Sequence, residues 1–111
     1  MTTQNRLLSF IAAFAVFAAL LVVYSRTLMP GTVGGDAGEL QYAAPLLALV
    51  HPTGQPLYVL LGYVWTSLLS LGTAAYEMNV LAAVSGAIGG GLVAWFVGRV
   101  CVRLSCYSSS V

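Results

Sequence analysis

The sequence predicts an all-α membrane protein in which two transmembrane helices flank an outer loop. The chain has 111 residues, of which 59% are hydrophobic and 6% are charged, and its mean hydropathy is +0.93. A soluble domain is usually about 45–50% apolar and about 25% charged. Two apolar stretches, one at each end, are long enough to cross a bilayer. We therefore expect membrane lipid as a partner. We expect no nucleic acid, because the chain has no Lys and no basic stripe.

The first apolar stretch predicts a retained transmembrane helix from about Arg6 to Leu28. A hydrocarbon core about 30 Å thick needs about 20 helical residues. The apolar run 7–24 exceeds the roughly 7–15 residues of a signal-peptide core, and no small-residue cleavage site follows it. Pro30 and the glycine-rich segment 31–35 end the helix.

Two shorter helices are predicted within the loop. Segment 36–50 has apolar residues at three- and four-residue steps, which is a helical pattern, and Gln41 lies off that stripe. We expect Pro45 to bend this helix and His51-Pro52 to end it, since a residue before proline avoids the helical region. Pro56 suits the first turn of a second helix, predicted to reach Leu71 and to be marginal as a span. The apolar residues of the first pattern are Leu40, Ala43, Ala44, Leu47 and Val50.

The last helix is predicted to start near Glu77, to run through Phe96 and to end at Arg99 and Arg103. Cytoplasmic flanks prefer basic residues. Arg6 and the last two Arg are therefore placed on the same side by two crossings, about 7–28 and 78–98. Residues 29–77 then form an outer loop in a single membrane domain, with two interfacial or re-entrant helices. Arg26 does not fit the preference for basic residues on the cytoplasmic side, whether the chain crosses the membrane two or three times. A three-span alternative stays open.

Small residues repeat in the last span at four-residue steps, at Ala82, Gly86 and Gly90. This spacing allows helices to approach closely. We expect the span to pack against other protein, because so short a chain offers little to receive it. Cys101 and Cys106 fit neither a redox motif nor a zinc site and are interpreted as free thiols, with juxtamembrane acylation as the alternative.

Segment 34–56 of the loop contains the only Asp, the only His and two of the three acidic residues: Asp36, Glu39 and His51. Three residues apart on a helix, Asp36 and Glu39 share a face, and a carboxylate there can act as a general base on a hydroxyl. The same spacing also fits a capping box, so both interpretations stay open. His51 is a candidate for phosphate binding or proton transfer, or for a structural hydrogen bond.

Aromatic residues of the loop have two interpretations as well. They can stack on a sugar, or they form the aromatic belt of a membrane interface. No metal-ligand set, glycine-rich phosphate loop or nucleophile with its base is recognised in the sequence. The aromatic residues concerned are Tyr42, Tyr58, Tyr63 and Trp65.

Three motifs in order resemble the N-terminal part of a family of large polytopic membrane proteins, long of unknown function. The animal members of that family are endoplasmic-reticulum protein O-mannosyltransferases. The chain departs from the family's Asp-Ser-Gly-Glu by Ala37 and from its His-Pro-Pro-Gly by Thr53. The motifs are Thr32-Val33-Gly34-Gly35-Asp36-Ala37-Gly38-Glu39, Val50-His51-Pro52-Thr53-Gly54-Gln55-Pro56-Leu57-Tyr58 with Leu60-Leu61-Gly62, and Asn79-Val80-Leu81-Ala82-Ala83.

The resemblance implies a C-type membrane glycosyltransferase. Such an enzyme transfers a sugar, mannose in the animal members, from a polyprenyl-phosphate donor to a hydroxyl acceptor with inversion. It implies Asp36 as the base or acceptor-orienting carboxylate and Glu39 as its helper. It also implies substrate-binding roles for His51, Gln55 and Tyr58. No cofactor is implied, and metal dependence stays open.

Family members have roughly ten or more spans, so the remaining helices of a full-length protein are expected partners. The chain alone is expected to be an inactive N-terminal fragment, and its unpatterned tail 105–111 agrees with this expectation. The alternative is a non-catalytic small membrane protein or a transporter fragment whose two acids only cap a helix. Ala and Gly richness favours a bacterial inner membrane over the endoplasmic reticulum.

Overall fold

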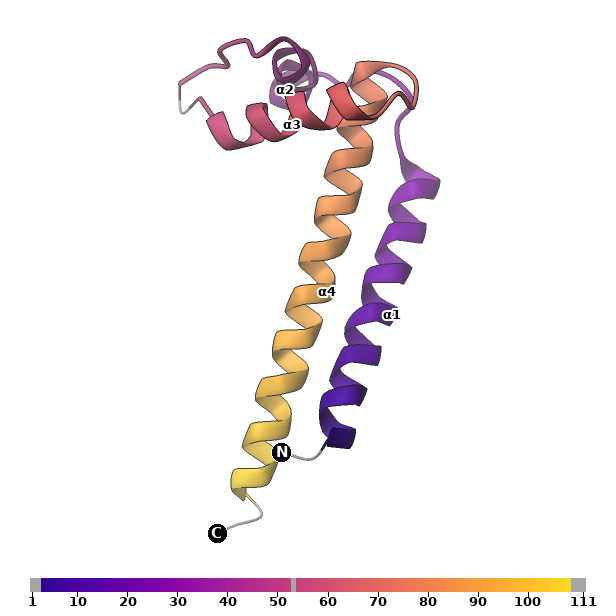
Figure 1. Cartoon of the computed structure of the whole chain (residues 1–111), viewed down its shortest axis with the longest axis vertical. Coiled ribbons are helices and arrows are strands. Elements are labelled where there is room, and N and C mark those ends of the chain that lie inside the picture. Colours follow the sequence, from indigo (N-terminus) through magenta and orange to yellow (C-terminus); the bar gives the residue numbers. More distant parts are fainter. Residues whose placement is uncertain (1–2, 53, 109–111) are drawn as a thin grey trace. The chain divides into compact units, whose positions relative to one another are not determined.

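The computed structural model describes residues 3–52 and 54–108, and within them the chain forms four helices and no strand (Figure 1). These are α1 (Thr3–Thr27), α2 (Gly35–Leu46), α3 (Pro56–Leu68) and α4 (Ala74–Ser108). The predicted all-α class is confirmed. The chain divides into two compact units. We call Met1–Arg26 with Val84–Val111 the hairpin unit, and Thr27–Ala83 the loop unit.

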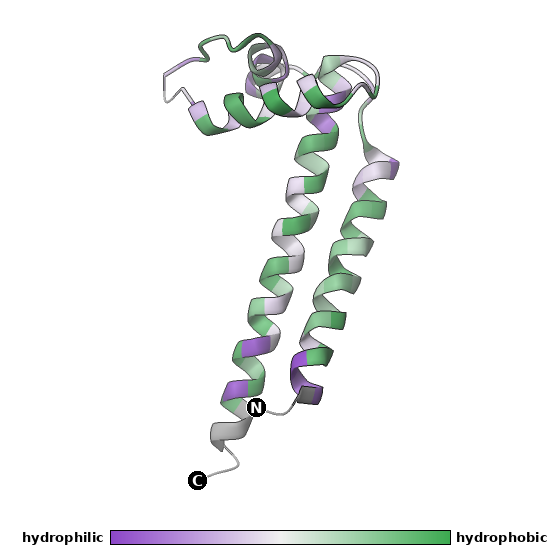
Figure 2. Cartoon of the chain, viewed as in Figure 1, coloured by the Kyte–Doolittle hydropathy of each residue, from purple (hydrophilic) through white to green (hydrophobic). Residues whose placement is uncertain are grey.

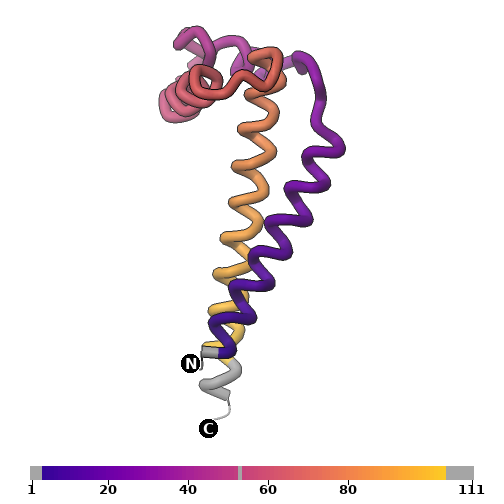
Figure 3. The backbone as a smooth tube through the Cα atoms, turned by 45° about the vertical axis from the view of Figure 1, so that its right-hand side comes forward, coloured from indigo at the N-terminus to yellow at the C-terminus, as the bar shows by residue number. Residues whose placement is uncertain are grey.

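The hairpin unit is built from α1 and the larger part of α4, which run antiparallel (Figure 3). Gly98 faces Ser9, Gly91 faces Phe17 and Gly86 faces Tyr24. Later residues of α1 therefore face earlier residues of α4, as antiparallel helices require. Both helices are long and apolar enough to cross a membrane, over Gln4–Thr27 and Ala74–Leu104. Figure 2 shows hydrophobic residues along most of both. The two predicted spans are confirmed.

Glycines allow the close approach of these helices. A Cβ at Gly91 would lie 3.1 Å from the Cβ of Phe17 and 3.3 Å from the carbonyl oxygen of Ala13, so a side chain there has little room. Gly86 and Gly90 also face α1, at Tyr24 and Leu20. The small-residue spacing therefore predicted close packing correctly. The expectation that so short a chain offers little for this span to pack against was wrong, since α1 packs along it.

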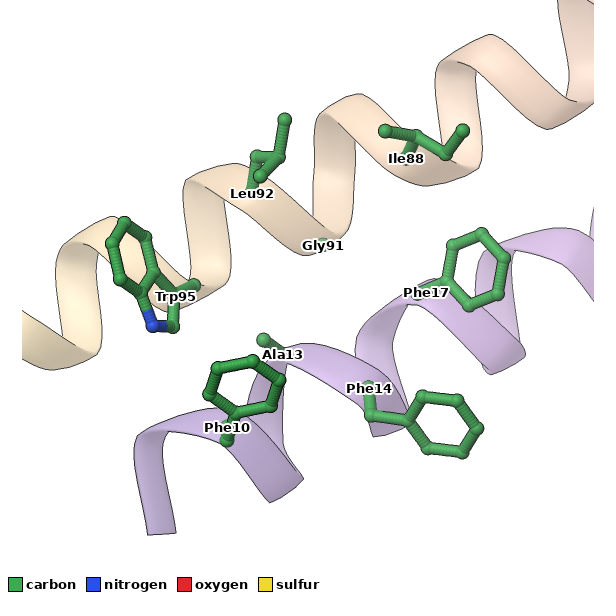
Figure 4. Close-up of a pocket in the computed structure, with 8 residues that line it drawn as sticks. All are labelled: Phe10, Ala13, Phe14, Phe17, Ile88, Gly91, Leu92 and Trp95. Atoms are coloured by element: carbon green, nitrogen blue, oxygen red, sulfur yellow. The ribbon is translucent and has the colours of Figure 1, made fainter. Parts of the chain in front are cut away.

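An apolar groove of about 360 Å³ runs between the two helices, with small residues at its floor (Figure 4). Large apolar side chains around it are exposed, for example Phe14 at 68% and Leu92 at 61%. Such exposure is unfavourable in water but not in hydrocarbon. The hairpin unit is thus suited to lipid. The groove is lined by Phe10, Ala13, Phe14, Phe17, Ile88, Gly91, Leu92 and Trp95.

Charge placement in the hairpin unit agrees with two crossings. Because Ser9 faces Gly98, Arg6 lies at the same end of the pair as Arg99 and Arg103. Helix α3 has 13 residues, a length of about 20 Å at 1.5 Å per residue, which is short of a bilayer core of about 30 Å. The three-span alternative is therefore not supported. Which face of the membrane the loop unit occupies stays a prediction.

Two predicted helix ends were wrong because the turn chemistry was misjudged. Helix α2 stops at Leu46, not near His51, since Leu47 adopts the left-handed conformation (φ 52°) and its N–H bonds to Ala44. Pro45 lies in the last turn of α2. Helix α3 starts at Pro56 as predicted and ends at Leu68 rather than Leu71.

The last helix begins earlier and ends later than predicted. The Thr73 hydroxyl accepts the N–H of Tyr76 (3.3 Å) and caps α4 at Ala74, ahead of Glu77. The helix continues beyond Arg103 to Ser108. Cys101 is a free, exposed thiol, as predicted. The predictions for the Cys106 side chain, for Thr53 and for the end of the tail fall outside the residues or side chains that the structure describes.

A small core holds the loop unit together. Ala44 of α2 and Met78 and Leu81 of α4 are buried, and Tyr58 and Trp65 of α3 pack against them. Polar bonds add to this core. The indole N–H of Trp65 donates to the carbonyl oxygen of Glu77 (2.9 Å), and the buried Glu77 side chain accepts the N–H of Leu71 (2.9 Å). The start of α4 therefore anchors both α3 and the turn that follows it.

Candidate functional site

Asp36 lies in the first turn of α2 and is exposed. The residue that caps this helix is Gly34, with extended backbone and no side-chain cap, and Gly35 follows with φ +68°. The capping-box interpretation was wrong, because Asp36 is already the second helical residue. No hydrogen bond to the Asp36 side chain is found among the described residues. Its carboxylate is therefore free to receive a proton or an acceptor hydroxyl.

Glu39 lies one turn further along α2 and holds His51 with both of its carboxylate oxygens. Oε1 accepts the backbone N–H of His51 (2.8 Å), and Oε2 lies 2.6 Å from the ring Nδ1. The side-chain hydrogen bond raises the pKa of His51 above its ordinary value of 6.5 and lowers that of Glu39 below 4.5. Glu39 thus fixes both the backbone and the ring of His51, which leaves Nε2 as the other nitrogen available to a ligand.

The structure brings Asp36, Glu39 and His51 together. One ligand atom from each lies within 4.8 Å of the others. The negative charge of Asp36 also favours the protonated form of His51. The sequence predicted the pair of acids on one face. It did not predict that the histidine 12 positions beyond Glu39 joins them, because this depends on the course of the chain after α2.

The same three side chains are those that could hold a metal ion, a set that the sequence analysis did not recognise. Carboxylate and imidazole together suit Zn²⁺ or Mn²⁺. A cation would have to compete with the bond between Glu39 and His51. A metal ion and that bond are therefore alternatives at this site.

The other two residues predicted to bind substrate lie further along the same segment. Gln55 is exposed and adopts a left-handed backbone conformation (φ 33°) just before α3. Tyr58 is half-buried against the core of the loop unit, and burial raises the pKa of its hydroxyl. Among the described residues no hydrogen bond joins either side chain to Asp36, Glu39 or His51. Their predicted roles stay predictions.

Four aromatic side chains of the loop unit differ in exposure. Tyr42 is 70% exposed and Tyr63 is 41% exposed, so their rings are available to a ligand or to an interface. Trp65 packs on the core and uses its indole N–H internally. Stacking on a sugar is therefore open to the two tyrosines and less so to Trp65.

Two amide side chains that the sequence analysis did not select connect this region. Gln41 of α2 is only 5% exposed; its Oε1 accepts the N–H of Val33 (3.0 Å), and its Nε2 donates to Oδ1 of Asn79. Asn79 of α4 in turn donates to the carbonyl oxygens of Met29 (2.9 Å) and Gly31 (3.3 Å). The expectation that Gln41 lies outside the packed face was wrong. The signal available in the sequence was a lone amide among apolar neighbours in α2.

Comparison with known proteins identifies relatives of this chain. Residues 36–110 match the family described as the protein O-mannosyl-transferase TMEM260 N-terminal domain. The chain is 40% identical over 85 residues to "Protein O-mannosyl-transferase TMEM260" of Mus musculus, covering 77% of the chain and 12% of that protein. It is 33% identical over 75 residues to the Dictyostelium discoideum protein of the same name, covering 66% and 9%. No solved structure matches.

These matches bear on two expectations. The resemblance to an O-mannosyltransferase-related membrane family is confirmed, and with two apolar helices the protein is an integral membrane protein. The expectation of a bacterial inner membrane is not supported, because both relatives are eukaryotic. The chain spans between 9% and 12% of the length of these relatives.

Proposed function

Since the chain belongs to the family of the protein O-mannosyl-transferase TMEM260 N-terminal domain, we propose that it forms the acceptor side of a mannosyl-transfer site in a membrane enzyme. The donor in this proposal is mannose on a polyprenyl phosphate, and the acceptor is a protein hydroxyl. One observation carries the proposal: Asp36, Glu39 and His51 converge within the part of the chain that matches the family.

Asp36 acts as the general base. Its carboxylate takes the proton of a serine or threonine hydroxyl while the hydroxyl oxygen attacks C1 of the mannose. The bond between C1 and the phosphate oxygen breaks, and its electron pair leaves with the polyprenyl phosphate. Attack opposite the leaving group inverts the configuration at C1. The exposed carboxylate of Asp36, without an internal hydrogen bond among the described residues, supports this role.

His51 provides positive charge for the leaving phosphate. Glu39 engages Nδ1 and raises the pKa of the ring, so the imidazolium persists to higher pH than in a free histidine. Nε2 then donates to a phosphate oxygen as negative charge develops there, and preorganised charge of this kind stabilises a transition state. Glu39 therefore acts through His51, not as a helper of Asp36. Gln55 and Tyr58, which follow on the same segment, are proposed to contact the sugar.

The remaining parts of the donor pocket come from outside this chain. Membrane lipid and the further transmembrane helices of the full-length protein are the partners in this proposal, since the chain spans only 12% of the mouse relative. The non-catalytic alternative relied on Asp36 and Glu39 as helix caps. Gly34 occupies the cap position, so that argument loses its support.

The test is Asp36→Asn in the full-length protein, with transfer of mannose from polyprenyl-phosphate mannose to an acceptor peptide as the assay. Loss of a general base costs about 100-fold or more in rate, so transfer should fall by that factor while the protein still inserts in the membrane. Gln4→Glu, an exposed change in α1, is the control and should retain activity. Full activity of Asp36→Asn would refute the proposal.

A further inference from the structure

The segment that leads from α1 to Asp36 has no helix or strand of its own, yet side chains hold it at three points. The carbonyl oxygens of Met29 and Gly31 both accept hydrogen bonds from Asn79, at 2.9 and 3.3 Å. The N–H of Val33 donates to Gln41 at 3.0 Å. A bond between the two amides links α2 to α4. Every polar atom of both side chains therefore has a partner, which is what the buried amide of Gln41 requires.

Backbone packing holds the same segment from a further direction. A Cβ at Gly38 would overlap the carbonyl oxygen of Val33, so α2 passes directly against this segment and only glycine fits. Val33 is thus bonded through its N–H and packed through its carbonyl oxygen. Only Gly34 and Gly35 separate it from Asp36. Gly34 caps α2 and Gly35 is its first residue, so Val33 adjoins the first turn of the helix that carries Asp36, and the contacts that hold Val33 against α2 also hold that turn.

We propose that Gln41 and Asn79 are positioning residues that set where the Asp36 carboxylate lies. The statement that this positioning serves mannosyl transfer rests on the proposed function. The statement that the two amides set the place of Asp36 does not depend on it. Neither amide touches substrate. Asn79 fixes residues 29–31 to α4, and Gln41 fixes Val33 to α2. Together they hold the segment on which Asp36 depends, and a misplacement of about 1 Å near a reacting group can cost about 100-fold in rate.

The first measurement needs no enzyme activity. Asp36→Cys is made in a background in which Cys101 and Cys106 are Ser, and a soluble maleimide reports the reactivity of the new thiol in nanodiscs. Asn79→Asp keeps the acceptor for Gln41 but removes both donated bonds to the 29–31 carbonyls. It should change the labelling rate by roughly tenfold if the segment loosens. An unchanged rate overturns the proposal.

A second variant guards against misfolding of the first. Gln41→Glu keeps an acceptor for the N–H of Val33 but loses the donor to Asn79, and it should change labelling in the same direction. The control Gln4→Glu makes the same chemical change at an exposed position and should not. Helix content by circular dichroism must stay that of the parent for either variant to count. Labelling that responds equally to Gln4→Glu overturns the proposal.

The transfer assay in the full-length protein separates positioning from a purely structural role. With Asp36 intact, Asn79→Asp should lower kcat by about 100-fold while KM for the donor stays within about twofold. Activity relative to the parent should recover as pH falls, because a protonated carboxyl donates a hydrogen bond again. If Asp36→Asn leaves transfer intact while labelling still responds, the proposed function fails and the geometric inference stands. An altered KM with unchanged kcat overturns the positioning role.

Discussion

Gly62 of α3 should not be replaceable by a larger residue without loss of stability. A Cβ added there would lie 2.6 Å from the Cβ of Ala44 and 2.7 and 2.8 Å from the end of the Met78 side chain. Carbon atoms in contact need about 3.5–4.0 Å, so relief requires a shift of about 1 Å. Ala44 is fixed by its backbone and is fully buried, and Met78 is 1% exposed, so neither has space to withdraw.

The expected magnitude follows from two opposing effects. Overpacking of a well-packed core typically costs about 1–3 kcal/mol, and the fixed Ala44 contact argues for the upper end. Alanine gains up to about 1 kcal/mol over glycine inside a helix. Gly62→Ala should therefore lower the free energy of unfolding by about 2 kcal/mol.

Trp65 offers a local assay, because it packs on the same core and the chain has only two tryptophans. With Trp95→Phe as background, Trp65 emission follows unfolding of the loop unit by denaturant in micelles. Gly89→Ala is the matched control, since a Cβ there meets nothing within 4 Å. Combining Gly62→Ala with Ala44→Gly should recover most of the loss, because it removes the fixed contact. A stability equal to that of the parent would refute the overpacking argument.

Three further predictions concern charge, packing and topology. Glu39→Gln should lower the pKa of His51 toward 6.5 in an NMR titration. The bond between Glu39 and His51 stabilises the folded chain, and the part due to the raised pKa of His51 is complete below pH 6.5 and is lost as pH rises through that raised pKa. The part due to Glu39 is lost as pH falls through its lowered pKa. Ser9→Cys with Gly98→Cys should form a disulfide on oxidation, because the two Cβ positions are 3.4 Å apart. Ser70→Cys should react with an impermeant thiol reagent from the non-cytoplasmic face only.

Each of these has a result that would contradict it. A His51 pKa that does not change on removal of the Glu39 charge would argue against the hydrogen bond to Nδ1. Equal cross-linking of Ser9→Cys with Gly89→Cys would argue against the antiparallel register, since no α1 atom lies near Gly89. Labelling of Ser70→Cys from the cytoplasm would exclude an outer loop. The thiol experiments use a background in which both native cysteines are Ser.

Local chemistry made the spans and the start of α3 predictable. Apolar length alone decides which helices can cross a bilayer, and Pro56 has the fixed φ angle that suits a first helical turn. The end of α2 was not predictable in this way. Leu47 takes a left-handed conformation that a leucine adopts rarely, and the N–H groups of Leu47 and Ala48 bond back to the carbonyl oxygens of Ala44 and Ala43 there.

The candidate site shows the same limit. The spacing of Asp36 and Glu39 placed them on one helix face, but the acidic pattern matched a capping box that the backbone does not form. Gly34, two residues before Asp36, takes the cap position instead. His51 meets Glu39, and Asn79 meets Gln41, only through tertiary contacts, which no sequence periodicity predicts. Sequence reasoning therefore identified the participants better than their pairings.

The loop unit is specified more by polar ties than by its apolar core. Three residues, Ala44, Met78 and Leu81, make up its main buried cluster. Long-range ties by contrast join α2 to α4 through amides and α3 to α4 through Trp65, and Glu39 joins α2 to the segment after it.

Apolar contacts can be made in several arrangements, whereas a hydrogen-bonded polar pair requires one geometry. The tie between α2 and α4 uses neutral amides, and that between α3 and α4 uses an indole N–H and a carbonyl oxygen. The bond between Glu39 and His51 involves groups that titrate. Loss of loop geometry with pH should therefore begin at His51 and leave the Gln41–Asn79 bond intact.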